Sequence, residues 1–237
     1  MTGIIVGRRS VLAGGALLAA ASPAVGIAAA IAEPAGMAPA FSPVPVALPF
    51  AAASLTWLSE KLIVSHHDNN YAGAVKRLGA IHAELARTDP IAAPGFTING
   101  LKREELIAWN SMILHELYFA GLGAASAPAP RLARRIEQDF GSHDRWAGEF
   151  SGIGKALGGG SGWVLLTWSP RDRRLTNQWA ADHTMTMAGA TPILALDMYE
   201  HAYAMDFGAK AGAYVDAFMK SVGWGEANRR FAEVAEG

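Results

Sequence analysis

The chain has 237 residues, no cysteine, and a formal net charge of −1 from 20 basic and 21 acidic residues. This balance excludes the basic excess typical of nucleic-acid-binding proteins. The absence of cysteine excludes disulfides, thiolate zinc sites, iron–sulfur clusters and cysteine nucleophiles. A metal site would therefore need imidazole and carboxylate ligands, and seven histidines are available.

The first 32 residues differ in kind from the rest. Arg8 and Arg9 precede a long uncharged run rich in alanine and glycine, which ends in small residues at Ala32. This pattern predicts a twin-arginine (Tat) signal peptide at 1–32 and a periplasmic or secreted protein, with no membrane segment in the mature form. An uncleaved membrane anchor is the alternative, which the weak hydrophobicity of the run disfavours. Residues 33–47 are rich in proline and predict an extended lead-in.

The next part of the chain predicts two helices. Ser59 can cap a helix that runs to about residue 85, with Leu62, His66, Asn70 and Ala74 on one face. Asn99 can cap a second helix over 101–120, which the following glycines end. We therefore expect an N-terminal helical-hairpin domain over 48–125.

The second half predicts a mixed domain over 130–235. Helices are expected over 131–140 and 143–157, with Ser142 as the cap of the second, and again over 211–222 and 225–234. The apolar segments 163–168, 175–179 and 191–196 predict strands, the first two joined as a hairpin. The predicted fold class is α+β, a helical hairpin followed by an α/β domain with a small antiparallel three-stranded sheet.

Asp197 and His201 lie just past the third predicted strand, where polar side chains are costly unless they have partners. They could form a buried hydrogen-bonded pair or contribute to a metal site. His66 and His115 lie on apolar faces of the two predicted helices, where a single histidine is more often an ordinary core residue. Three such histidines and one aspartate, without any thiolate, favour a redox or Lewis-acid metal held by nitrogen and oxygen.

Several segments match the landmarks of one family: Leu48-Pro49-Phe50, residues 59–78, His115–Phe119, Phe140-Gly141-Ser142, Gly160–Trp163 and Asp197–Tyr203. Over residues 48–235 the chain resembles the iron/manganese superoxide dismutases. The resemblance implies one Fe or Mn ion per subunit, superoxide as substrate, and oxygen and hydrogen peroxide as products. The implied metal ligands are His66, His115, Asp197 and His201.

The same resemblance assigns supporting roles around the metal. Phe119, Trp163 and Tyr199 would form an aromatic wall, and Glu200 would reach the partner subunit's fourth ligand, which implies a homodimer. The family uses a side chain, usually glutamine, to hydrogen-bond the solvent at the metal. We expect His183 to take this role, on the strand before Asp197; an exposed loop histidine is the alternative.

Three positions depart from the family pattern. Asn70, Ala74 and Ala204 stand where the family has a histidine and two tyrosines, which form a gateway and proton relay. We expect a remodelled entrance and a reduced but not abolished turnover.

Two alternatives to dismutation remain open at this point. One is a homodimer that binds metal with little or no dismutase activity and serves stress or metal resistance. The other is a non-haem iron oxidoreductase acting on a different substrate, because two histidines and a carboxylate also serve that chemistry.

Overall fold

The computed structural model describes residues 41–235, which belong to one compact unit. The predicted signal peptide and the first part of the lead-in lie outside the described residues. Among the helices that are described, none is both long enough and apolar enough to cross a membrane. The boundary between the segments 48–125 and 130–235 stays a prediction.

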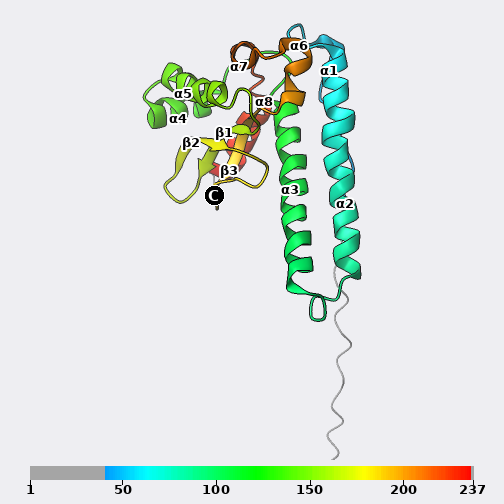
Figure 1. Ribbon diagram of the computed structural model, residues 1–237. Coiled ribbons are helices and arrows are strands. Elements are labelled where there is room, and N and C mark those ends of the chain that lie inside the picture. Colours follow the sequence, from blue (N-terminus) through cyan, green and yellow to red (C-terminus); the bar gives the residue numbers. More distant parts are fainter. Residues whose placement is uncertain (1–40, 236–237) are drawn as a thin grey trace, which may run out of the picture. The chain divides into compact units, whose positions relative to one another are not determined.

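The first half forms a helical hairpin (Figure 1). After a short 3₁₀ turn, η1 (Ala52–Ser54), one continuous helix is made of α1 (Glu60–Ser65), a π-helical segment, η2 (His66–Tyr71), and α2 (Ala72–Arg87). Its partner is α3 (Gly95–Ala120). The Ser59 hydroxyl caps α1 as predicted and accepts a hydrogen bond from the Leu62 N–H at 3.1 Å.

The predicted start of the second helix at residue 101 is wrong. Helix α3 begins at Gly95, and Pro94 occupies the capping position with an extended backbone. The Pro94 carbonyl accepts the Thr97 N–H at 2.9 Å, so the first turn closes six residues earlier than expected. Asn99 lies inside the helix and does not cap it.

The buried face of the first helix also differs from the expected one. The predicted stripe follows i+4 steps through residues 62, 66, 70 and 74, whereas the buried stripe runs through Leu62, His66, Tyr71 and Val75. The five-residue step from 66 to 71 coincides with the π segment, in which the Ala72 N–H bonds to the His67 carbonyl. A π turn holds an extra residue and shifts every later side chain around the helix.

The second half contains a small sheet surrounded by helices (Figure 1). Its elements are α4 (Pro130–Phe140), α5 (His143–Ala156), β1 (Trp163–Ser169), β2 (Arg174–Ala180), β3 (Thr191–Asp197), η3 (Glu200–Ala202), α6 (Ala204–Phe207), α7 (Ala211–Lys220) and α8 (Gly225–Ala235). The Ser142 cap is confirmed, since its hydroxyl accepts the Arg145 N–H at 3.1 Å. The two short turns η3 and α6 were not predicted.

The three predicted strands form one antiparallel sheet in the order β2-β1-β3. Trp163, the first residue of β1, pairs with Asp197, the last residue of β3. Gly162 precedes this pair with φ of +137°, and a Cβ there would collide with the Ala180 carbonyl oxygen. Glycine is therefore required at 162, where the carbonyl accepts the Met198 N–H at 2.9 Å and fixes the chain just beyond Asp197.

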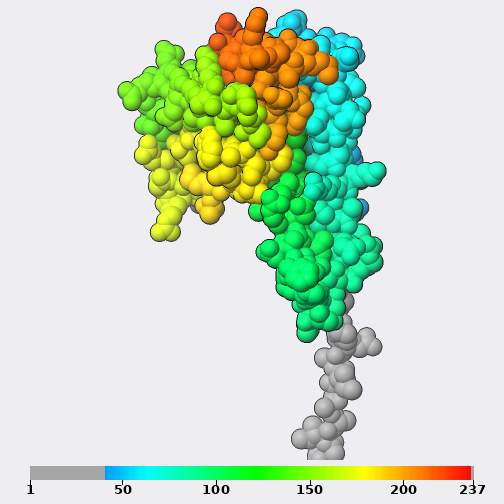
Figure 2. All heavy atoms as spheres, in the orientation of Figure 1, coloured from blue at the N-terminus to red at the C-terminus, as the bar shows by residue number. Residues whose placement is uncertain are grey.

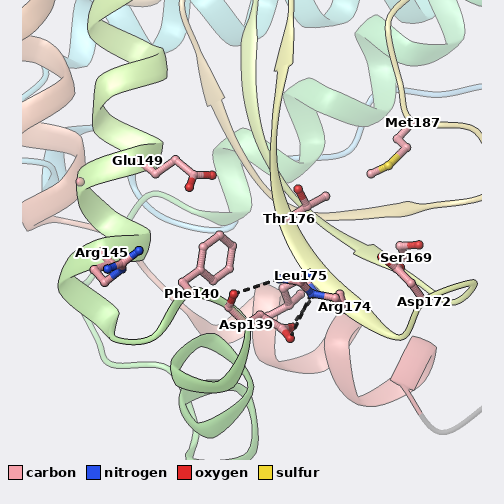
Figure 3. A pocket seen from close by; sticks show the side chains of 11 residues that line it. Asp139, Phe140, Arg145, Glu149, Ser169, Asp172, Arg174, Leu175, Thr176 and Met187 are labelled. Carbon is pink, nitrogen blue, oxygen red and sulfur yellow. Dashed lines mark hydrogen bonds and ion pairs between the residues drawn. The ribbon is translucent and has the colours of Figure 1, made fainter.

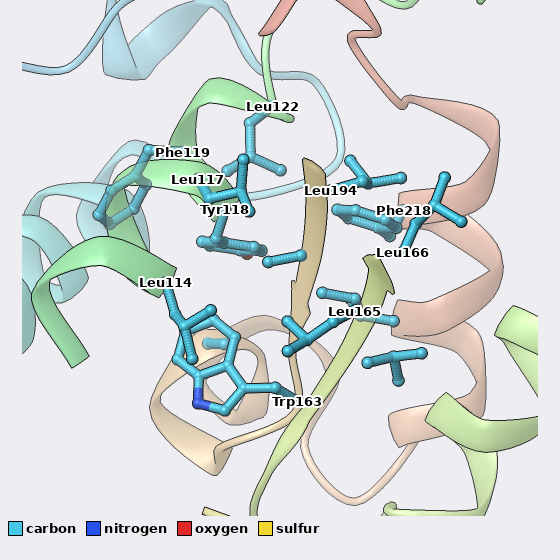
Figure 4. Packing of buried hydrophobic residues seen from close by; sticks show 14 of the residues in the cluster. Leu114, Leu117, Tyr118, Phe119, Leu122, Trp163, Leu165, Leu166, Leu194 and Phe218 are labelled. Atoms are coloured by element: carbon cyan, nitrogen blue, oxygen red, sulfur yellow. The ribbon is translucent and has the colours of Figure 1, made fainter. Parts of the chain in front are cut away.

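A shared apolar core joins the hairpin to the sheet (Figure 4). Leu117 and Tyr118 of α3 pack toward Leu165 of β1 and Leu194 of β3, all of them buried. The Tyr118 ring stacks on Phe218 of α7, with ring centroids 6.3 Å apart. Each buried large apolar side chain contributes about 1.5–3 kcal/mol, so this seam firmly holds the C-terminal half of α3 against the sheet.

The other end of the hairpin stands clear of the sheet (Figure 2). The loop between α2 and α3 lies there, and the apolar side chains of Ile91 in this loop and of Phe96 in the first turn of α3 are exposed. Only the half of α3 that follows Ala108 is heavily buried. Side chains of α3 that meet groups from β3 must therefore come from this second half, and His115 is one of them.

Candidate metal centre

Four side chains that can bind a metal converge between the hairpin and the sheet. They are His66, His115, Asp197 and His201, here called the His/Asp cluster, and their nearest ligand atoms all lie within 4.8 Å of one another. The Asp197 Oδ2 is 3.2 Å from His66 Nε2, 3.6 Å from His115 Nε2 and 3.4 Å from His201 Nε2.

The facing atoms of the His/Asp cluster have no hydrogen-bond partner among residues 41–235. The Nε2 atoms of the three histidines and the Asp197 Oδ2 are all buried and unsatisfied. An unpaired buried polar atom costs about 1–3 kcal/mol, and more when it is charged. Four such atoms around one point are expected where a cation completes the structure.

The spacing of these atoms fits an ion of the first transition series. Metal bonds to imidazole nitrogen and carboxylate oxygen are about 2.0–2.2 Å long. Two ligands on such an ion lie about 3–4 Å apart at the usual bond angles. The separations of 3.2, 3.4 and 3.6 Å from Asp197 Oδ2 fall in this range. The residues present therefore fit a single ion with nitrogen and oxygen ligands.

Each member of the cluster comes from a different element. His66 opens the π segment η2, and such segments are frequent at functional sites. His115 lies on the buried half of α3, and Asp197 ends β3. His201 follows in the turn η3, which folds the chain back toward Asp197.

Backbone and hydroxyl groups orient two of these side chains. The His115 Nδ1–H donates to the Ser111 carbonyl at 2.6 Å, which leaves Nε2 as the lone-pair nitrogen facing the cluster. The Asp197 Oδ1 accepts the Tyr199 N–H at 2.8 Å, so only Oδ2 faces the histidines. The Tyr214 hydroxyl donates to the Asp197 carbonyl at 2.8 Å and holds the end of β3.

Burial sets the protonation of the cluster. It lowers the pKa of His115 to about 3 and also lowers the pKa of His66, so both rings are neutral at ordinary pH. Burial alone would raise the pKa of Asp197, but the facing rings of His201 and His66 hold it well below the usual range. The result is a carboxylate at Asp197 and neutral imidazoles at His66 and His115, the forms that bind metal.

Aromatic rings lie against the side chains of the cluster. The Phe119 ring centroid is 5.0 Å from that of His66, and the Trp163 centroid is 5.2 Å from that of His115. Tyr199 stacks on His201 at 5.3 Å. These rings exclude water from most sides of the site, which strengthens charge interactions within it.

His183 stands beside the cluster on a loop. The Trp163 Nε1–H donates to His183 Nδ1 at 3.0 Å, and the His183 ring stacks on Tyr199 at 4.8 Å. The expected placement of His183 on a strand is wrong, because β2 ends at Ala180 and the chain turns before β3 begins. The residue is nevertheless partly buried and not an exposed loop histidine.

A cavity of about 320 Å³ reaches the cluster from the surface. His115, His183 and His201 line it, together with Asn70 and Ala74, two of the altered gateway positions. The third altered position does not join them. Ala204 begins α6 and does not line this cavity. The exposed residue Glu200 lies in η3, directly before His201.

A larger cavity lies elsewhere and contains no member of the His/Asp cluster. It has a volume of about 590 Å³ and lies between α4, α5 and the β1–β2 hairpin (Figure 3). Its side chains carry both signs of charge, and the buried Asp139 bonds to Arg135 and to the Leu175 N–H. A large volume therefore does not identify the reaction site in this protein, because the reaction needs the ligand atoms that converge in the His/Asp cluster.

Sequence reasoning missed two tyrosines that support the site. The hydroxyls of Tyr118 and Tyr214 lie 3.1 Å apart, and both are fully buried. Burial raises the pKa of both phenols, so they remain protonated donors. The available signal was a tyrosine on an otherwise apolar helix face, because a buried hydroxyl must find a partner.

The comparisons with known proteins agree on one family. Residues 128–230 match the model of the C-terminal domain of iron/manganese superoxide dismutases. The chain is 67% identical over 180 residues to a protein of Cupriavidus metallidurans named superoxide dismutase [Fe], covering 76% of this chain and 91% of that one. It is 34% identical over 182 residues to superoxide dismutase [Mn] 1 of Halobacterium salinarum, with shares of 76% and 89%.

The lowered pKa values of the buried histidines predict how the free energy of unfolding of the metal-free protein depends on pH. Between the ordinary histidine pKa of 6.5 and the value of about 3 for His115, the unfolded chain binds more protons than the folded one. The free energy of unfolding therefore falls as the pH is lowered through this window, by about 1.4 kcal/mol per pH unit for each such histidine. Urea denaturation of metal-free protein at several pH values measures the slope.

A His115→Gln variant serves as the matched comparison. It removes one buried titrating ring, so its slope should be shallower by about 1.4 kcal/mol per pH unit between about pH 4 and 5.5. Equal slopes for the two proteins would show that His115 is not held neutral by burial.

Proposed function

The chain belongs to the iron/manganese superoxide dismutase family, and we propose that the His/Asp cluster holds its metal ion. The reaction is dismutation, in which two superoxide anions and two protons give one oxygen molecule and one hydrogen peroxide. One iron or manganese ion per subunit serves it. The observation that carries the assignment is the convergence of four buried, unsatisfied ligand atoms. A protein that binds no metal would gain no stability from placing these four unsatisfied atoms together.

When bound, the ion would supply one-electron redox chemistry, and the His/Asp cluster would hold it. The chain supplies a ligand set of net charge −1, from the Asp197 carboxylate and three neutral imidazoles. This offsets part of the ion's charge in a nearly dry site. The aromatic residues Phe119, Trp163 and Tyr199 keep other reactants away, while the cavity beside Asn70 and Ala74 admits a small anion.

We assign His183 the role of hydrogen-bonding the solvent at the site. Because Trp163 donates to His183 Nδ1, the ring carries its own proton on Nε2. His183 also lines the cavity that reaches His115 and His201. With asparagine and alanine at 70 and 74, no ionisable side chain at those positions passes protons inward. Water in the cavity must do so, which favours a slower proton supply than a complete relay gives.

Two variants separate a metal ligand from a supporting residue. His115→Ala should lose both the metal and the activity, because the remaining ligands leave the site incomplete. His183→Ala should keep about one metal ion per chain and lose about 10–100-fold in activity. Elemental analysis and a superoxide assay on the same preparations measure both. A His115→Ala protein with full metal and activity would refute the assignment.

We propose that the protein is a homodimer with Glu200 at the contact. Glu200 is exposed in the isolated chain and directly precedes His201, so a partner that covers it would also cover the edge of the site. Glu200→Ala should therefore shift the protein toward monomer in light scattering, whereas Glu149→Ala, an exposed acid on α5, should not. A wild-type protein that is monomeric at micromolar concentration contradicts the proposal.

We further propose export by the twin-arginine route. The support is in the sequence, namely Arg8 and Arg9 before an uncharged segment that ends at Ala32. Protein from the periplasmic fraction should begin at Glu33, and a variant with lysine at both positions 8 and 9 should stay in the cytoplasm. An exported protein that keeps residues 1–32, or export that is indifferent to the arginine pair, would overturn this proposal.

A further inference from the structure

The position of His183 depends on the turn that carries it. The turn begins after Ala180, and three contacts hold His183 within it. Trp163 donates to its ring at 3.0 Å, Tyr199 stacks on that ring, and the Asn110 side-chain amide donates to its carbonyl at 2.6 Å. A change in this turn would therefore move or loosen a group that lines the cavity to the metal.

A thioether closes this turn. The Ala181 N–H donates to the Met185 Sδ, with 3.4 Å between nitrogen and sulfur, so the bond spans the residues on both sides of His183. The Gln178 side chain fixes the segment that follows the turn, donating to the Met185 carbonyl at 2.9 Å and accepting the Met187 N–H at 3.0 Å. Sulfur is a weak acceptor, and the bond it makes is the vulnerable one of the three.

The sulfur that closes the turn belongs to an accessible residue. Met185 is 38% exposed, whereas Met198, beside Asp197, is fully buried. The proposed reaction releases hydrogen peroxide through the cavity that His183 lines. A soft thioether two residues from that wall is therefore placed near a continuous source of oxidant.

We propose that Met185 is a site of reversible oxidation by hydrogen peroxide, and that its sulfoxide opens the turn that positions His183. The supply of peroxide by the protein itself rests on the proposed function. The modification needs only peroxide and an accessible sulfur.

The chemistry balances with peroxide as the sole oxidant. A sulfur lone pair attacks one peroxide oxygen, an S–O bond forms, and the O–O bond breaks. The departing hydroxide takes the proton of the transferred OH group and leaves as water. Sulfur is oxidised by two electrons and peroxide is reduced by two. The product side chain is pyramidal and polar, so the Ala181 N–H no longer meets the sulfur at its former position.

Met187 provides a matched control within the same loop. It is 37% exposed, almost the same as Met185, and lines the large cavity beside α5 (Figure 3). Its backbone N–H bonds to Gln178, but no hydrogen bond to its sulfur is present among the described residues. Its oxidation should therefore leave the turn around His183 closed.

The test uses the metal-loaded wild type, Met185→Leu and Met187→Leu, each treated with added hydrogen peroxide that catalase then removes. Peptide mass spectrometry identifies the sulfoxides, and amide exchange reports the Ala181 N–H. Half of each sample is then incubated with methionine sulfoxide reductases, which restore the thioether but not oxidised rings or a damaged metal site. Activities are compared with each protein's own untreated value.

We expect a sulfoxide at Met185, faster exchange of the Ala181 amide, and a loss of activity of about tenfold at full conversion, which the reductases reverse. Met187→Leu should behave like the wild type, and Met185→Leu should show no reversible loss. A Met185 that stays unoxidised, or a sulfoxide that changes neither exchange nor activity, overturns the proposal. If the protein shows no dismutase activity, the mass and exchange measurements still decide the question at Met185.

Discussion

The structure depends on one electrostatic constraint, a carboxylate buried among imidazole lone pairs. Asp197 is fully buried, and its Oδ2 faces the Nε2 atoms of His66, His115 and His201. None of these atoms has a hydrogen-bond partner among the described residues. A buried anion costs several kcal/mol unless it is paired. A bound cation converts this penalty into binding energy, so folding and metal binding are coupled.

The fold satisfies the constraint by locking the backbone on both sides of Asp197. Trp163 pairs with Asp197 across the sheet, and the Gly162 carbonyl holds the next N–H. The buried Tyr214 hydroxyl donates to the Asp197 carbonyl, and this hydroxyl lies against Tyr118. Each contact involves a main-chain or fully buried group, so the carboxylate has little freedom to turn away. The three histidines can then come from separate elements and still face the same carboxylate oxygen.

The parts of the fold that depend on short stretches of sequence could be predicted from it, and the parts that bring distant residues together could not. Alternation and turn residues placed the strands and most helices, because these patterns are local. The short spacing of Asp197 and His201 marked half of the cluster. His66 and His115 lie far away in the sequence, and only the family resemblance joined them to the other two. Chemistry restricted the ligand types, but geometry was needed to bring them together.

The errors have equally specific causes. A regular helix cannot show a π turn, so the expected stripe through Asn70 and Ala74 missed the shift to Tyr71 and Val75. The helix expected over 101–120 starts too late because its start was taken from Asn99, whereas Pro94, with an extended ψ, is the residue from which the helix begins. For His183, the strand pattern did not reveal that the chain leaves the sheet first. In each case the backbone departs from the expected helix or strand at a place that the side-chain pattern does not clearly mark.

The shift caused by the π segment also determines what guards the site. Tyr71 turns into the core, where its hydroxyl donates to Glu116 and accepts the Val46 N–H, and burial raises its pKa to about 12. Asn70 and Ala74 are left on the cavity wall. At these two positions the helix contributes no ionisable group, and Arg77, which lines the same cavity, is paired with Glu104. His183, which also lines the cavity, is then the side chain that can hold a proton near the metal. The group that can hold a proton near the metal therefore lies on a loop and not on a helix, and loops change conformation more readily than helices.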